Sequence, residues 1–180
     1  RQRLCAAVWL DRRAAGRYPR GRGPGARIAH EMTAIPVGKA EIRREGRSGL
    51  LLLAFGTVLA PCLPVAERLD ATLVNMRFAK PLDEDMVLSL AATHECIVTI
   101  EENAIAGGAG SAVSECLAAA GMGREVHRIG IPDRLIEHGS REDCLAMAGL
   151  DAAGLEQAIT RTWRGQRPAR AVAGLRPAAL

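Results

Sequence analysis

Residues 49–57, GLLLLAFGT, form a continuous apolar run without a single charged side chain. A strand with one solvent-facing side alternates apolar and polar residues, whereas a strand buried on both faces reads as an unbroken apolar run. The run is far too short to cross a bilayer. It therefore predicts a central strand of a sheet that is covered by helices on both sides.

Strand-like and helix-like patterns alternate after this run. Further strands are predicted at 71–76, 96–102 and 124–132, and an amphipathic edge strand within 35–46. Helices are predicted at 60–70, 83–94 and 108–121, from Ser140 and from near Asp151. Alternation at this spacing predicts an α/β fold with three layers, α/β/α, and a mostly parallel sheet of about five strands.

The charge distribution separates the middle of the chain from its ends. Residues 1–47 carry a net charge of +8, residues 48–160 carry −9 and residues 161–180 carry +5. The basic ends lack interleaved aromatic residues, so we expect no nucleic-acid partner. The five cysteines are scattered singly, which is typical of thiols in a reducing cytoplasm. We expect a cytoplasmic protein without a membrane segment or a structural metal.

Arg77 and Lys80 follow the predicted strand 71–76, on a loop at its carboxyl end. Ligands of parallel α/β sheets meet this edge, and a guanidinium there can bind phosphate through two hydrogen bonds. The alternative is a surface ion pair with the acidic residues 83–85 of the next helix. The local pattern by itself favours the surface ion pair.

Residues 101–113, EENAIAGGAGSAV, place two glutamates at a strand end before a glycine loop and a helix. Such a loop can cradle a phosphate, but the lysine of a P-loop is missing, so a tight turn with close helix packing is favoured. Glu101 and Glu102 should point to opposite faces of the strand, which makes a shared acid/base role poor. No cysteine, histidine or serine pattern indicates a catalytic group or a metal ligand set.

Several segments together resemble one enzyme family. They are RYPRGRGPG, IPVGKAEIRREG, LLAFGTVLAP, LDATLVNMRFAKPLDED, VTIEENAIAGGAGSAV and IGIPDRLIEHG. Their order and spacing are similar to those in the carboxyl-terminal part of 1-deoxy-D-xylulose-5-phosphate synthase. The resemblance covers roughly residues 17–160 and implies a domain of the transketolase carboxyl-terminal type.

The resemblance implies a thiamine-diphosphate- and Mg²⁺-dependent transferase. The family condenses pyruvate with glyceraldehyde 3-phosphate, with loss of CO₂, in isoprenoid, thiamine and pyridoxal precursor synthesis. In that family two arginines bind the phosphate of the acceptor, and they match Arg17 and Arg77 here. Lys80 and Glu101 are expected to support the loops of this site. The family's cofactor motif and activating glutamate have no counterpart in this chain, so no catalytic residue and no bound cofactor are expected.

The same resemblance divides the chain into three parts. Residues 1–34 correspond to the end of the middle, pyrimidine-binding domain and a linker, residues 35–160 to the transketolase-like domain, and residues 161–180 to a disordered basic tail. We expect a fragment of a homodimeric enzyme that is inactive alone, either truncated or frameshifted. A non-catalytic binding or assembly module and a subunit of a split thiamine-diphosphate enzyme are the alternatives.

Overall fold

The computed structural model describes residues 34–132, 134, 136 and 138–166. Its sheet consists of β1 (Glu41–Arg44), β2 (Leu50–Phe55), β3 (Thr72–Asn75), β4 (Cys96–Ala104) and β5 (Val126–Ile131). Its helices are η1, a single 3₁₀ turn (Gly56–Val58), α2 (Leu59–Arg68), α3 (Glu84–Thr93), α4 (Ala109–Ala119), α5 (Arg141–Ala148) and α6 (Ala152–Gln166).

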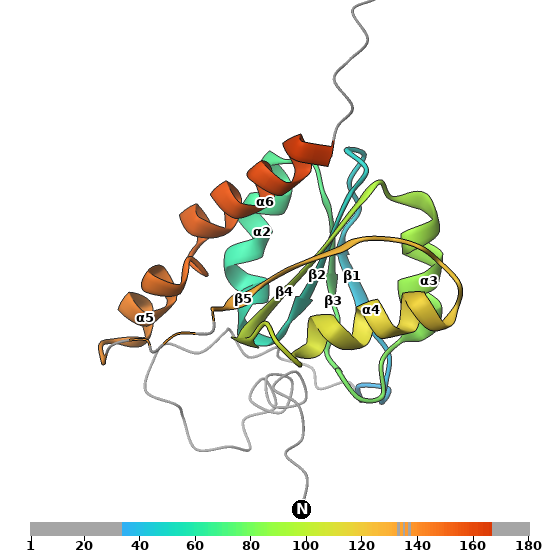
Figure 1. The fold of residues 1–180 in the computed structure, drawn as a ribbon, viewed down its shortest axis with the longest axis horizontal. Helices are drawn as coiled ribbons and strands as arrows, with labels where there is room; N and C mark the ends of the chain where they lie inside the picture. The colour runs from blue at the N-terminus through green and yellow to red at the C-terminus, as the bar shows by residue number, and fades with distance from the viewer. Residues whose placement is uncertain (1–33, 133, 135, 137, 167–180) are drawn as a thin grey trace, which may run out of the picture.

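The sheet is mostly parallel, with the strand order β1-β3-β2-β4-β5. β2 pairs in parallel with both β3 and β4, and β4 pairs in parallel with β5. β1 is the exception, because it runs antiparallel along β3 at one edge. Figure 1 shows α2, α5 and α6 on one side of this sheet and α3 and α4 on the other. The predicted three-layer fold is confirmed.

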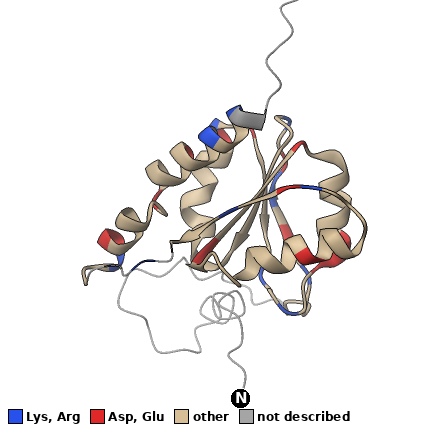
Figure 2. Cartoon of the chain, viewed as in Figure 1, with Lys and Arg blue, Asp and Glu red and all other residues tan. Residues whose placement is uncertain are grey.

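Alternate side chains of β2 pack against the helix layers on the two faces of the sheet. Leu50 and Leu52 face the cluster formed with α2 and α6, whereas Leu51 and Leu53 face the cluster formed with α3 and α4. All four leucines are fully buried. In Figure 2 β2 carries no blue or red, whereas the charged segments lie on helices, loops, the edge strands and the end of β4. An apolar strand buried on both faces is what the run at 49–57 predicts.

Helix α6 corrects one predicted boundary. A disordered tail was expected to begin at residue 161, but the helix continues to Gln166. Its buried residues Leu155 and Ile159 pack into the core, and Trp163 packs against the same cluster one turn later. The apolar spacing of four residues therefore extends the helix beyond the expected end.

Candidate functional site

The carboxyl ends of the parallel strands bring the candidate residues to one edge of the sheet. Thr57 follows β2, Arg77 follows β3, and Glu101 and Glu102 lie near the end of β4. Parallel strands place their carboxyl ends together, so these side chains project from neighbouring loops and strand ends. Arg77 contributes a cationic group to this edge, and Glu101 and Glu102 contribute carboxylates.

Arg77 lies in a sharp backbone turn. Its φ angle is +55°, which is in the left-handed region that non-glycine residues seldom adopt. The Asn75 side chain fixes the turn, because its Oδ1 accepts a hydrogen bond from the Arg77 N–H at 3.2 Å. Residues held in this conformation cluster at binding and catalytic sites. The loop therefore fixes the backbone of Arg77 at the end of β3.

The Arg77 guanidinium contacts a carboxylate from the edge strand. Its Nη2 lies 2.5 Å from Oε2 of Glu41, and the Arg77 side chain is only 17% exposed. The Nη1 of Arg43 lies 3.3 Å from each oxygen of the same carboxylate. Two guanidinium groups thus converge on one carboxylate, which leaves the three-residue cluster with a net positive charge. Such a cluster attracts anions.

The alternative pairing of Arg77 with the acidic turn is not the one found. Asp83 instead accepts hydrogen bonds from the Lys39 Nζ at 3.1 Å and from the Ala40 N–H at 2.9 Å, and it caps α3 through Met86. Burial of Asp83 opposes its ionisation, but these hydrogen bonds outweigh burial and lower the pKa of the carboxyl. Lys80 is exposed on the loop between β3 and α3. Its expected support of that loop stays a prediction.

Glu101 fills the amino terminus of α4. It is only 3% exposed, and its two carboxylate oxygens accept hydrogen bonds from the N–H groups of Ala109 at 2.6 Å and Gly110 at 2.9 Å. A Cβ atom at Gly108 would collide with this carboxylate. The glycine loop thus allows a close approach of Glu101, and a phosphate at the same place would meet its negative charge.

Glu102 points to the other face of the sheet and binds different partners. Its Oε2 contacts Thr57 Oγ1 and lies 2.8 Å from Nη2 of Arg141, which also donates to Thr57 at 2.8 Å. Adjacent strand residues project to opposite sides, as predicted. Arg141 and Thr57 were missed in the sequence. The one available signal was the position of Arg141 directly after the Ser140 cap of α5.

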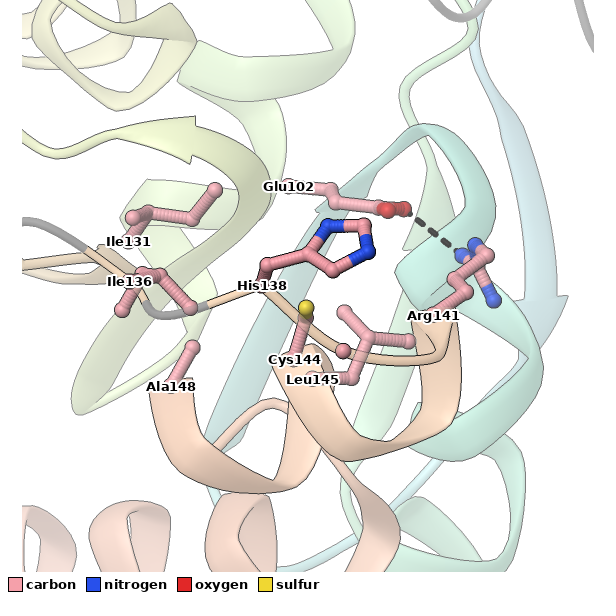
Figure 3. Close-up of a pocket in the computed structure, with 9 residues that line it drawn as sticks. Glu102, Ile131, Ile136, His138, Arg141, Cys144, Leu145 and Ala148 are labelled. Carbon is pink, nitrogen blue, oxygen red and sulfur yellow. Dashed lines mark hydrogen bonds and ion pairs between the residues drawn. The ribbon is translucent and has the colours of Figure 1, made fainter.

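A hollow of about 330 Å³ lies beside this polar cluster. Figure 3 shows Glu102 and Arg141 at one end, the His138 ring and Cys144 sulfur in the middle, and Ile131, Ile136 and Ala148 at the other end. The hollow is mostly apolar, and Arg141 at its rim is already paired with Glu102. Its walls combine apolar side chains with the His138 ring and the Cys144 thiol.

The buried thiols Cys62 and Cys96 and the His94 ring have structural surroundings. Burial raises the pKa of Cys62 to about 12, and burial together with the Glu125 charge raises that of Cys96 to about 11. Both thiols stay protonated at neutral pH and are poor nucleophiles. His94 is used structurally, because its ring contacts Thr72 and the Leu90 carbonyl. Arg17, the other predicted phosphate ligand, lies outside the described residues.

Residues 38–155 match the family described as "Transketolase, C-terminal domain". The chain belongs to this family. Similarity to individual proteins is closer still. The chain is 54% identical over 168 residues to the 1-deoxy-D-xylulose-5-phosphate synthase of Nitrosococcus oceani, and 58% identical over 159 residues to that of Methylococcus capsulatus. These alignments cover 93% and 88% of the chain but only 26% and 25% of the two enzymes. The chain thus spans about a quarter of these relatives and resembles their transketolase-like carboxyl-terminal domain.

A solved structure of the transketolase class has the same fold. It is a split-gene transketolase, described as an inactive beta4 tetramer, with a TM-score of 0.63 and 25% sequence identity. The similarity covers 83% of this chain and 46% of the solved one. Since the transketolase carboxyl-terminal family is confirmed by sequence and by fold, the resemblance inferred from the motifs is correct.

Thiamine diphosphate and its metal do not fit the described part of this transketolase-type domain. No group of three or more His, Cys, Asp or Glu side chains in residues 34–132, 134, 136 and 138–166 could hold a metal ion. The amino terminus of α4, where N–H groups could bind a diphosphate, is filled by Glu101. We assign no step of cofactor chemistry to these residues. Within the same described part, no helix is both long enough and apolar enough to cross a membrane.

Proposed function

We propose that this chain is the carboxyl-terminal domain of a 1-deoxy-D-xylulose-5-phosphate synthase and that it helps to bind the acceptor substrate. The proposal is supported by 54% and 58% identity to two such enzymes across about nine-tenths of the chain. The reaction joins pyruvate to glyceraldehyde 3-phosphate with loss of CO₂. In the complete enzyme, a cofactor bound by other domains supplies the carbanion chemistry.

Arg77 is the residue that we propose for the phosphate of glyceraldehyde 3-phosphate. The supporting observation is its placement, a guanidinium held by a left-handed turn at the carboxyl end of β3. A guanidinium binds phosphate oxygens through charge-assisted hydrogen bonds. Phosphate binding at the non-reacting end of the substrate can hold its aldehyde at attack distance. Arg17 is proposed as the second arginine of this site, and Lys80 and Glu101 as supports of the adjoining loops.

The chain alone is proposed to bind but not to turn over substrate. A second candidate, a subunit of a split thiamine-diphosphate enzyme, is favoured by one finding: the solved chain with the same fold is a split-gene transketolase described as an inactive beta4 tetramer. A non-catalytic binding or assembly module stays the third candidate. Homodimer formation within the complete enzyme is part of the leading proposal.

Calorimetry with glyceraldehyde 3-phosphate tests the proposed site. We expect the 180-residue chain to bind with a dissociation constant in the millimolar range or tighter. Arg77→Ala should weaken binding by at least tenfold, because loss of one charged partner costs on the order of 2–4 kcal/mol. Arg161→Ala, which removes an exposed arginine on α6, is the matched control and should bind like the original chain.

Two results would contradict the proposal. Equal binding by the Arg77→Ala and Arg161→Ala chains would remove Arg77 from the phosphate site. Conversion of pyruvate and glyceraldehyde 3-phosphate by the purified chain, in the presence of thiamine diphosphate and Mg²⁺, would show that the chain is active alone. A neighbouring reading frame that carries the cofactor domains would favour the split-enzyme candidate.

A further inference from the structure

In the structure the Glu41 carboxylate forms an ion pair with the Arg77 guanidinium. The carboxylate Oε2 lies 2.5 Å from Nη2 of Arg77, a short charge-assisted contact. Glu41 itself is 36% exposed and Arg77 is 17% exposed, so the pair lies at the surface but is not fully solvated. A phosphate that approaches this side of the guanidinium would therefore meet a carboxylate already bound there.

The pairing of β1 with β3 places this carboxylate. Glu41 is the register partner of Asn75 across the antiparallel edge, and Asn75 is the residue whose side chain holds the Arg77 N–H. The same residue pair of the sheet thus supplies the carboxylate, from Glu41, and the side chain that binds the Arg77 backbone, from Asn75. Because β1 is the edge strand, it can bring a side chain to Arg77 without passing through the core.

Arg43 provides a second partner for the same carboxylate. Its Nη1 lies 3.3 Å from both oxygens of Glu41, and its side chain is 43% exposed. A Glu41 carboxylate that leaves Arg77 can therefore keep an ion pair with Arg43. In the structure the carboxylate is shared between the two arginines.

We propose that Glu41 sets the anion affinity of Arg77 by acting as an internal competitor that a phosphate must displace. The inference rests on the proposed phosphate-binding role of Arg77. A positioning role is the other interpretation of the same contact. The two interpretations predict opposite effects of removing the Glu41 charge, because a positioning role predicts weaker phosphate binding and a competitor role predicts tighter binding. A competing carboxylate repels the incoming anion and holds the guanidinium that the anion needs.

Displacement of the Glu41 carboxylate weakens the binding of every anion by about the same factor, so it does not change their order of affinity. A doubly charged phosphate gains more from the guanidinium than a monoanion does and therefore stays the tighter ligand. The weakened site would then bind phosphate at concentrations that leave the carboxylate of a small organic acid such as pyruvate unbound. Removal of its charge should strengthen the binding of both kinds of anion.

Titration of the full 180-residue chain with inorganic phosphate, at fixed ionic strength, tests the proposal. Glu41→Gln should tighten phosphate binding roughly three- to tenfold, the range expected when a partly exposed ion pair no longer competes. Glu45→Gln is the control, because it removes the same charge from an exposed site just beyond β1. It should change the affinity by less than about twofold. Thermal unfolding verifies that each variant is folded.

The Arg77→Ala substitution, made alone and with Glu41→Gln, separates the two levels of the inference. Loss of phosphate binding in both Arg77→Ala chains, together with tightening in Glu41→Gln, supports the proposal. Weaker binding in Glu41→Gln, or an effect equal to that of Glu45→Gln, overturns the competitor role and leaves Arg77 as a phosphate ligand. Phosphate binding that ignores Arg77→Ala, or no binding by the original and Glu41→Gln chains, overturns both.

A second readout applies to the free chain. The Nε–Hε resonance of Arg77 reports the environment of the guanidinium directly in a two-dimensional ¹H–¹⁵N spectrum. In the original chain, phosphate should move this resonance toward its position in the phosphate-saturated Glu41→Gln chain. If phosphate moves other arginine resonances but not that of Arg77, the proposal is wrong.

Discussion

Replacement of Glu101 by alanine should destabilise the domain more than any other single carboxylate change at the sheet edge. The side chain is 3% exposed and accepts hydrogen bonds from the N–H groups of Ala109 and Gly110 at the start of α4. Alanine would leave both donors buried without this partner. The negative charge at the positive end of the helix dipole would be lost as well.

The expected cost follows from these contacts. A lost helix cap typically costs 0.5–2 kcal/mol, and a buried donor left unsatisfied costs about 1–3 kcal/mol. For the cap and the two freed N–H donors the lower limits sum to about 2.5 kcal/mol. Because a carboxylate-sized space can admit water to these donors, the cost is taken near that limit, at about 3 kcal/mol. For a chain of this size, that change lowers the Tm by roughly 6–12 °C.

The neighbouring glutamate supplies the matched control. Glu102 lies on the same strand but is 30% exposed, and its partner Arg141 is 46% exposed. Glu102→Ala should therefore cost only about 1 kcal/mol, because water can solvate the released partner. Urea unfolding of both variants, followed by circular dichroism, gives the two free energies of unfolding. A cost for Glu101→Ala below 0.5 kcal/mol, or below that for Glu102→Ala, would refute the capping role.

Two further predictions concern a cap and a thiol. Asp83→Asn should cost about 1 kcal/mol at neutral pH, because Asn can still cap α3 but loses the charge that binds Lys39 and one of the two acceptor oxygens. The folded-state pKa of Asp83 is lowered below its ordinary 3.8, so this stabilisation is full above about pH 4 and is lost as the pH falls further. Urea unfolding at pH 7 and pH 3 measures it, and an equal cost at both pH values would contradict the assignment. Cys62, with a pKa of about 12, should resist alkylation at pH 8 until urea unfolds the chain, whereas half-buried Cys144 should react sooner. Mass mapping that finds Cys62 alkylated first in the folded chain would contradict its burial.

The order of strands and helices was predictable because the core has regular periodicity. Buried positions can be predicted from the unbroken apolar run of β2 and from the four-residue apolar spacing of the helices. The opposite directions of Glu101 and Glu102 follow from the two-residue period of a strand. The boundaries of elements near the ends of the domain were predicted less well, such as the end of α6 at Gln166.

The side-chain partners at the site were not predictable from local patterns. Arg77 and Glu41 lie 36 residues apart and meet only because β1 pairs with β3 at the sheet edge. Arg141 and Thr57 lie 84 residues apart and meet across loops of two different strands. Local sequence instead suggested the acidic turn at 83–85 as the partner of Arg77, and Lys39 takes that place. Tertiary pairing decided which of the opposite charges came into contact.

The most direct test of the proposed function replaces the corresponding segment of the Nitrosococcus oceani synthase with residues 38–155 of this chain. The chimera should convert pyruvate and glyceraldehyde 3-phosphate. Arg77→Ala within it should raise the KM for glyceraldehyde 3-phosphate at least tenfold and leave the KM for pyruvate almost unchanged, because only the acceptor carries a phosphate. An active chimera in which Arg77→Ala leaves the KM for glyceraldehyde 3-phosphate unaltered would contradict the account.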